Sequence, residues 1–136
     1  MTTALPDDLK KYLDESNAFA TVATLMPDGR PHQTVVWVIR DGDDLLFSTT
    51  ADRRQARNMA RDPRVAVVIN PPETPYVYTE VQGTVTLTPD TGHTLLDTIA
   101  RKYTGKSYAE FNAEAARTDG ERIAVRVTPD KVTGRR

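Results

Sequence analysis

Segments in which apolar and polar residues alternate occur through most of the chain, and this alternation is typical of strands with one buried face. The longest such segment is Tyr76–Leu87, and Gly83 in its middle indicates a bulge or a sharp bend. Turn-forming residues between the segments, such as Pro27 and Gly29, indicate tight connections. The pattern predicts strands at residues 18–25, 31–40, 44–49, 64–69, 76–87 and 122–127.

Helical spacing of apolar residues appears outside these strands. Leu9, Tyr12 and Leu13 predict a short N-terminal helix, a second helix is expected from about residue 52, and a third from Thr88 and Pro89. A further short helical stretch is expected near residue 111. Because consecutive strands joined by tight turns favour an antiparallel sheet, and a kinked long strand favours closure, we predict a mainly β (α+β) fold, a small six-stranded antiparallel barrel with peripheral helices.

Composition narrows the class of protein. A length of 136 residues predicts a single domain over residues 1–136. The longest apolar run, Val65–Ile69, is too short to cross a membrane, and the N-terminus lacks the features of a secretory signal, so we expect a cytoplasmic protein without a membrane partner. With no cysteine and only His32 and His93, no metal site is predicted. The net charge of -1 predicts no nucleic-acid partner.

The segment from residue 47 to 65 carries the strongest chemical signal, since a strand runs through a polar turn into an arginine-rich helix. The N-terminus of a helix offers unpaired N–H groups and the positive end of the helix dipole, so it favours anions. Hydroxyl groups before the helix and guanidinium groups within it add donors suited to phosphate oxygens. The candidate phosphate-binding residues are Ser48, Thr49, Thr50, Arg53, Arg54 and Arg57.

A purely structural explanation exists for the same residues, because an arginine-rich helix is most often a solvated face. Asp52 is a good N-cap, and Gln55 stands three residues later, where a capping box has its second member. The helical period predicts that Arg57 and Arg61 point to water. Arg53 and Gln55 flank the apolar stripe in the first turn, from which a ligand at the helix N-terminus is within reach.

The chain resembles the flavin-reductase-like split β-barrel family, which includes pyridoxamine 5'-phosphate oxidases and the deazaflavin-dependent oxidoreductases of actinobacteria. The resemblance rests on the order and spacing of several motifs rather than on any one of them, and it covers nearly the whole chain. It implies a six-stranded antiparallel split β-barrel. The motifs are DGRP at residues 28–31, LLFSTT at 45–50, RNMARDPRVAVVI at 57–69, EVQGTV at 80–85 and RIAVRVTPDKVTG at 122–134.

The resemblance is strongest to the small deazaflavin-dependent enzymes, in which coenzyme F-420 lies in a groove at a homodimer interface. It implies phosphate-side contacts at Ser48, Arg53 and position 55. Most relatives have lysine at position 55, whereas this chain has Gln55, which donates a hydrogen bond but carries no charge. The resemblance also implies that His32 and Thr34 face the deazaflavin ring.

Two aromatic positions are implied to act across the homodimer. Tyr76 and Tyr78 match residues that relatives contribute to the site of the opposite protomer, although ordinary interface packing explains them equally well. His32 and Thr34 have a structural alternative as the polar side of a hairpin. Trp37 is expected in the core or at the dimer contact.

The function implied by this resemblance needs no catalytic side chain from the protein. Deazaflavins transfer hydride from C5, so the protein supplies binding, orientation and exclusion of water. The sequence shows no evident nucleophile, carboxylate pair or histidine triad, and the catalytic residues stay unassigned; Tyr103 is assigned no role. We predict a deazaflavin (F-420)-dependent oxidoreductase that passes a hydride to an electron-poor or conjugated organic acceptor, whose identity the sequence does not determine.

Two alternatives stay open. The first is an FMN-dependent oxidoreductase of the same fold, although pyridoxal phosphate synthesis is disfavoured. True pyridoxamine phosphate oxidases have a basic segment where this chain has Thr34–Val38, and they have a histidine near the C-terminus where this chain ends VTGRR. The second alternative is a non-catalytic protein that binds the cofactor, since a binding groove and a reaction groove use the same residues.

Overall fold

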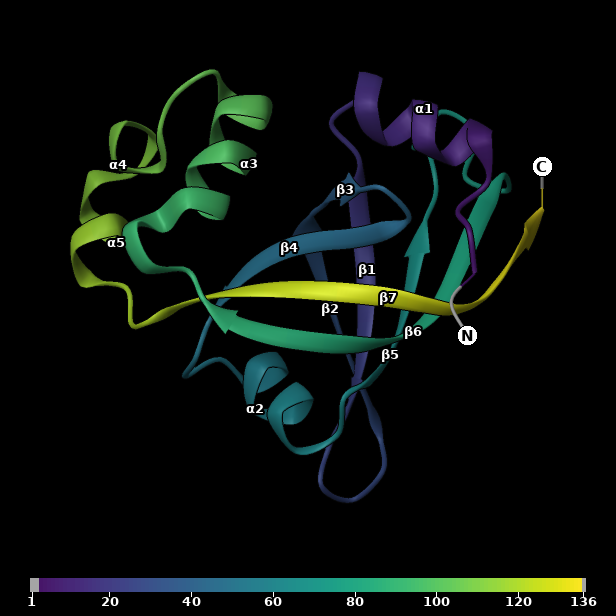
Figure 1. Cartoon of the computed structure of the whole chain (residues 1–136), viewed down its shortest axis with the longest axis horizontal. Coiled ribbons are helices and arrows are strands. Elements are labelled where there is room, and N and C mark those ends of the chain that lie inside the picture. The colour runs from purple at the N-terminus through teal and green to yellow at the C-terminus, as the bar shows by residue number, and fades with distance from the viewer. Residues whose placement is uncertain (1–2, 136) are drawn as a thin grey trace.

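The computed structural model describes residues 3–135 and shows a curled antiparallel sheet with helices around it (Figure 1). The strand order is β2-β1-β5-β6-β7-β4-β3, and β2 at one edge contacts β4 near the other. The predicted mainly β split barrel with peripheral helices is confirmed, with seven strands in the described residues rather than six. The strands are β1 Phe19–Leu25, β2 Pro31–Trp37, β3 Ile39–Asp41, β4 Asp44–Thr50, β5 Arg64–Ile69, β6 Tyr78–Pro89 and β7 Arg122–Arg135.

The additional strand arises because the predicted strand at residues 31–40 breaks at Val38. The buried Val38 N–H donates to the Tyr103 hydroxyl over 3.1 Å, and that hydroxyl lies 2.8 Å from the Val38 carbonyl. The same hydroxyl also hydrogen-bonds the carbonyl of Ala18. Since a side chain satisfies the backbone of Val38, β2 can pair with β1 while β3 pairs with β4. Tyr103 therefore holds the corner between two strands.

The bulge predicted at Gly83 is confirmed in the long β6–β7 ladder. Gln82 pairs with Lys131 and Gly83 pairs with Pro129, so Asp130 is an extra residue on β7. A Cβ atom on Gly83 would lie 2.6 Å from the carbonyl oxygen of Thr128. Only glycine permits this close approach of the two backbones, and the bulge adds curvature to the sheet.

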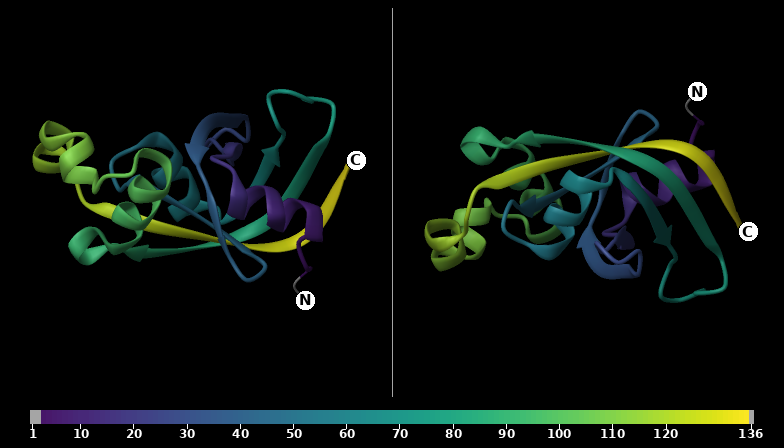
Figure 2. Two further views of the ribbon diagram at one scale, coloured as in Figure 1. Left: turned by 90° about the horizontal axis from the view of Figure 1, so that it is seen from above. Right: turned by 90° about the horizontal axis from the view of Figure 1, so that it is seen from below.

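Three groups of helices cover the sheet (Figures 1 and 2). The N-terminal helix lies at the end of the sheet where both termini lie, a second helix follows β4, and a cluster of short helices lies at the opposite end. The N-terminal helix buries Leu9 and Leu13, as the sequence predicted. The helices are α1 Asp7–Glu15, α2 Arg54–Arg61, the 3-10 helix η1 Thr91–His93, α3 Thr94–Thr104, α4 Tyr108–Phe111 and α5 Ala113–Thr118.

The predicted start of the third helix at Thr88 and Pro89 is wrong. Both residues continue β6, where Pro89 pairs with Ile123 of β7. Strand pairing with β7 therefore overrides the local tendency of proline to begin a helix. The carboxylate of Asp90 then accepts hydrogen bonds from the N–H groups of two residues early in α3.

The core lies inside the curl of the sheet and under α1. Alternate residues of β1, β4, β5 and β7 point inward, and Phe47, Leu45 and Val125 are at most 1% exposed. This period of two is the one read from the sequence. Within residues 3–135, no helix is long and apolar enough to cross a membrane.

Candidate cofactor-binding site

The turn from β4 into α2 leaves backbone donors free. The N–H of Arg53 donates to the carbonyl of Thr50 over 3.1 Å, and α2 begins at the next residue without a side-chain cap. Within residues 3–135, the N–H groups of Arg54, Gln55 and Ala56 have no hydrogen-bond acceptor. The N-terminus of α2 therefore presents the row of donors that favours anions.

The prediction that Asp52 caps this helix is wrong. Its carboxylate accepts a hydrogen bond from the Thr50 hydroxyl over 2.8 Å, and this bond holds the pKa of Asp52 below its usual value. Gln55 is not a capping-box partner either. Its side chain is buried, and its Nε2 donates to the hydroxyl of Thr34 on β2. The polar side chains that the sequence offered as caps therefore bond elsewhere.

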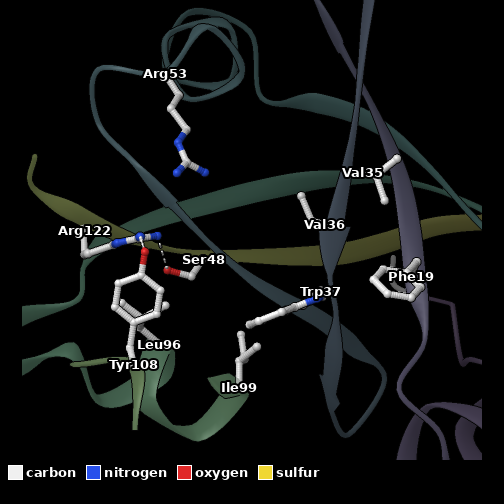
Figure 3. A pocket seen from close by; sticks show the side chains of 10 residues that line it. All are labelled: Phe19, Val35, Val36, Trp37, Ser48, Arg53, Leu96, Ile99, Tyr108 and Arg122. Atoms are coloured by element: carbon white, nitrogen blue, oxygen red, sulfur yellow. Dashed lines mark hydrogen bonds between the residues drawn. The ribbon is translucent and has the colours of Figure 1, made fainter. Parts of the chain in front are cut away.

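Two adjoining depressions lie beside this turn. The first, which we call the α2 hollow, measures about 340 Å³ between β2 and the start of α2 and is lined by His32, Thr34, Val35, Val36, Arg53, Arg54 and Gln55. The second, which we call the Trp37 groove, measures about 270 Å³ (Figure 3). It is lined by Phe19, Val35, Val36, Trp37, Ser48, Arg53, Leu96, Ile99, Tyr108 and Arg122. Since three residues line both depressions, the two form a continuous surface.

The Trp37 groove has an apolar wall built from β2 and α3. The ring of Trp37 stacks on Tyr103 with centroids 4.9 Å apart and an interplanar angle of 14°, and Phe111 lies 5.7 Å from it. Leu96 and Ile99 of α3 complete this wall. The stacked rings of Trp37 and Tyr103 are half-buried and give the wall a shape suited to a flat apolar ligand.

The opposite side of the Trp37 groove is polar and centres on Arg122. This guanidinium is buried, hydrogen-bonds the carboxylate of Asp119, and donates to the Tyr108 hydroxyl over 2.9 Å. It also makes a long contact of 3.4 Å to the hydroxyl of Ser48. In Figure 3, the side chain of Arg53 extends from the start of α2 toward Ser48 and Arg122. Two guanidinium groups therefore face one space.

Burial and nearby charges both act on the pKa of the Tyr108 phenol. Burial is the largest influence and raises the pKa of Tyr108, whereas the nearby charges of Arg122 and Arg53 act in the opposite direction. The guanidinium of Arg122 also lies 4.8 Å from the centroid of the Tyr108 ring. Because the net shift is upward, Tyr108 is a neutral hydroxyl at pH 7, able to donate as well as accept.

The structure brings together some of the residues predicted from the sequence. One continuous surface contains the residues of the polar turn and of β2, namely His32, Thr34, Ser48, Arg53, Arg54 and Gln55. This arrangement follows from α2 packing against β1 and β2, with Gln55 at the start of the helix bonded to Thr34 in the middle of β2.

Five other predicted residues lie outside both depressions. Thr49 and Thr50 are buried beneath the turn, and Arg57 is exposed on the outer face of α2. Tyr78 begins β6, whereas Tyr76 lies in the preceding turn, so the predicted start of this strand at residue 76 is wrong by two residues. Prolines around this turn interrupt the alternating pattern. Roles for these residues in binding stay predictions.

Sequence reasoning missed Arg122, Asp119 and Tyr108 as a cluster. The only local signal is that Arg122 opens an apolar strand, which is an unusual place for a charge. Tyr108 comes from a four-residue helix with a capping box formed by Ser107 and Glu110, and that box is visible in the sequence. Their convergence on Ser48 depends on the β4–β7 pairing, a long-range contact.

Comparison with known proteins defines the class. Residues 5–136 match the family model described as pyridoxamine 5'-phosphate oxidase. A solved structure named F420 reductase is 29% identical, with a TM-score of 0.79, and the match covers 95% of this chain and 98% of that one.

More distant structures share the fold alone. A putative pyridoxamine 5'-phosphate oxidase from Listeria innocua is 16% identical, with a TM-score of 0.67 over 94% of this chain and 95% of that one. The haem storage protein HutZ from Vibrio cholerae is 13% identical, with a TM-score of 0.70 over 97% of this chain and 95% of that one. The protein is thus a split β-barrel, the fold that these solved structures share. It belongs to the pyridoxamine 5'-phosphate oxidase family.

Proposed function

We propose that this protein is an F-420-dependent reductase that passes a hydride to an organic acceptor. The observation that carries the proposal is the row of free N–H groups at the start of α2 beside Arg53 and Arg54. Such a row of donors with two guanidinium groups matches the phosphate of a phosphorylated cofactor. The similarity to the F420 reductase supports the choice of coenzyme.

The residues present fit such a cofactor. Within residues 3–135, the side chain of Arg53 makes no hydrogen bond or salt bridge, so its guanidinium is available to an anion at the helix N-terminus. Gln55 ties α2 to Thr34 on β2 and fixes the width of the α2 hollow. The Trp37 groove continues from this hollow and offers an apolar wall for a planar ring.

When bound in its reduced form, the coenzyme would supply a hydride from C5, and the acceptor would gain that hydride together with a proton from water. The protein's own residues bind and orient. Arg53 and the α2 N–H groups hold the phosphate, His32 and Thr34 border the same hollow, and Trp37 excludes water from one wall. No side chain has to accept the electrons.

The proposal includes a homodimer. Phe19 and Val35 are 51% and 66% exposed and line the Trp37 groove, and Tyr76 is 80% exposed. A second copy over β1 and β2 would bury Phe19 and Val35 and close the groove against water. Sedimentation tests this, because a monomer that binds F-420 with full affinity contradicts the shared site.

Titration with F-420 and, in parallel, with FMN tests the choice of coenzyme. Tight F-420 binding with weak FMN binding is expected. A preference for FMN would overturn the deazaflavin assignment, and binding of neither would favour a fold used for another ligand. Oxidation of reduced F-420 in the presence of acceptors then separates a reductase from a carrier.

A further inference from the structure

The segment between α3 and β7, residues 105–120, is attached to the rest of the protein by few contacts. Its helices α4 and α5 contain no buried residue, and Phe111 at the end of α4 is 48% exposed. The helix caps lie within the segment, since Ser107 and Glu110 form a capping box and Asn112 accepts a hydrogen bond from a backbone N–H of α5. Segments with few buried apolar contacts are the parts of a protein that open most readily.

One side chain of the sheet holds this segment in place. The guanidinium of Arg122 donates to the Tyr108 hydroxyl over 2.9 Å and hydrogen-bonds the carboxylate of Asp119. The Tyr108 hydroxyl donates to the same carboxylate over 3.1 Å. Within residues 3–135, no other sheet residue hydrogen-bonds the segment, although Asp97 of α3 accepts from the backbone N–H of Tyr108 over 2.9 Å. We call the group of Tyr108, Asp119 and Arg122 the Arg122 latch.

The segment covers one side of the Trp37 groove. Tyr108 lines the groove, and in Figure 3 its hydroxyl points toward Arg122. The ring of Phe111 contacts the Trp37 indole, with centroids 5.7 Å apart. The groove measures about 270 Å³, below the range of roughly 300–1,000 Å³ that is usual for ligand pockets. Movement of the segment away from Trp37 would therefore widen the groove.

Glycines lie at both ends of the segment. Gly105 follows α3 with a φ of +79°, which glycine adopts without strain. Gly120 lies against the turn between β4 and α2, where a Cβ atom on it would be 3.4 Å from the carboxylate of Asp52. Hinges are a few residues at the ends of elements that absorb a change in backbone angles, and these two glycines have that position.

We propose that residues 105–120 form a lid over the Trp37 groove, which the Arg122 latch holds closed and which opens about Gly105 and Gly120 to admit a ligand. Arg53 and Tyr108 line the groove from the start of α2 and from the lid, so a ligand that contacts both favours the closed state. The lid does not rest on the proposed function, because any ligand of this groove would have to pass it.

Relaxation-dispersion NMR on the ligand-free protein tests the lid, because motion on the microsecond to millisecond timescale appears as exchange. Trp37 is the single tryptophan, so its indole N–H gives one signal. We expect this signal and the amides of residues 105–120 to share one exchange rate and one open population, without the same process in α1. If neither this protein nor the variants below show a shared process, the proposal is wrong.

Removing one hydroxyl group tests the latch. Tyr108→Phe should raise the open population roughly tenfold, since a hydrogen bond to a charged group is lost from the closed state alone. Thr118→Val is the matched control, because it removes a hydroxyl whose hydrogen bond to the Glu114 carbonyl lies within α5, and it should leave the population unchanged. Asp119→Asn weakens the same latch and takes the place of Tyr108→Phe if that variant does not fold. Equal populations in folded latch variants and the unsubstituted protein would overturn the role of the latch.

Acrylamide quenching of Trp37 fluorescence shows whether the motion uncovers the groove. The Stern–Volmer constant should be larger in Tyr108→Phe than in the unsubstituted protein and unchanged in Thr118→Val. Equal constants in all three proteins would mean that the segment moves without opening the groove, and this result contradicts the lid.

Addition of F-420 separates this inference from the proposed function. Saturating F-420 should suppress the exchange, because a ligand between Arg53 and Tyr108 favours the closed state. Exchange that persists unchanged with F-420 bound would refute closure of the lid over the groove. If F-420 does not bind, the proposed function fails, whereas the lid is decided by the measurements made without ligand.

Discussion

Replacing Arg53 with alanine is the sharpest test of the phosphate site. The side chain is exposed and, within residues 3–135, has no hydrogen bond or salt bridge to lose. We therefore expect the free energy of unfolding to change by less than about 0.5 kcal/mol. Any loss of coenzyme affinity in this variant then reports the contact to the ligand rather than damage to the fold.

The expected loss follows from the geometry. Two unit charges about 4 Å apart interact by roughly 4 kcal/mol at an effective dielectric constant of about 20, which is an upper bound for an exposed group. A charge-assisted hydrogen bond contributes about 1 to 3 kcal/mol, so the dissociation constant for F-420 should rise roughly 5- to 150-fold in Arg53→Ala. Salt screens exposed charges, so this ratio should shrink as ionic strength rises.

Fluorescence titration with F-420 measures the effect, with thermal unfolding as the check on folding. Arg117→Ala is the matched control, because it removes an exposed arginine from α5, outside both depressions. Arg57→Ala, on the outer face of α2, should have a smaller effect than Arg53→Ala. An unchanged dissociation constant in folded Arg53→Ala would refute the phosphate site.

Three further predictions concern the fold. Tyr103→Phe should destabilise the protein by about 1 to 2 kcal/mol in urea unfolding, because the buried N–H of Val38 loses its acceptor; an unchanged midpoint would contradict the corner role. Gly83→Ala should cost about 1 to 3 kcal/mol by the same assay, since its Cβ would meet backbone at 2.6 Å, and a neutral result would mean that the bulge can shift. The hydrogen bond from Arg64 lowers the pKa of Asp62 to about 2, so the stabilisation from this pair is complete above about pH 4 and is lost as the pH falls toward 2. Arg64→Gln should return the pKa toward its ordinary value in a carboxyl NMR titration, and a value still near 2 would assign the shift to another partner.

Most of the fold could be predicted because it depends on local pattern. Alternation located most strands to within a few residues, and Gly83 marked the bulge, but the last strand was predicted at residues 122–127 and β7 continues to Arg135, because β6 lies beside it as a pairing partner. The errors occur where a distant partner decides the outcome. β2 ends at Trp37 because Tyr103 of α3 occupies the next backbone groups, and β6 continues to Pro89 because β7 lies beside it. Neither partner is visible within a local window of sequence.

The candidate site also contains residues that a local stretch of sequence predicts and residues that only long-range contacts bring together. Arg53, Arg54 and Gln55 follow one another in sequence, so a single turn brings all three to the lining of the α2 hollow. Arg122 and Tyr108 reach Ser48 from residues 74 and 60 positions away, through the β4–β7 pairing and the helix cluster. The sequence shows that these residues are an arginine and a tyrosine, but only the tertiary structure brings them together.

The structure explains what the glutamine at position 55 does in place of the lysine expected from the family resemblance. A lysine there would bring charge to the hollow, whereas Gln55 is buried and directs its donor to Thr34. The amide therefore joins α2 to β2, and the positive charge in the hollow comes from Arg53 and Arg54 alone. Because these guanidinium groups are more exposed than a buried amide, coenzyme affinity in this protein should depend more strongly on salt than it would with a partly buried lysine at position 55. Of these two arginines, Arg53 also lines the adjoining Trp37 groove, so its guanidinium is the charge that both depressions share.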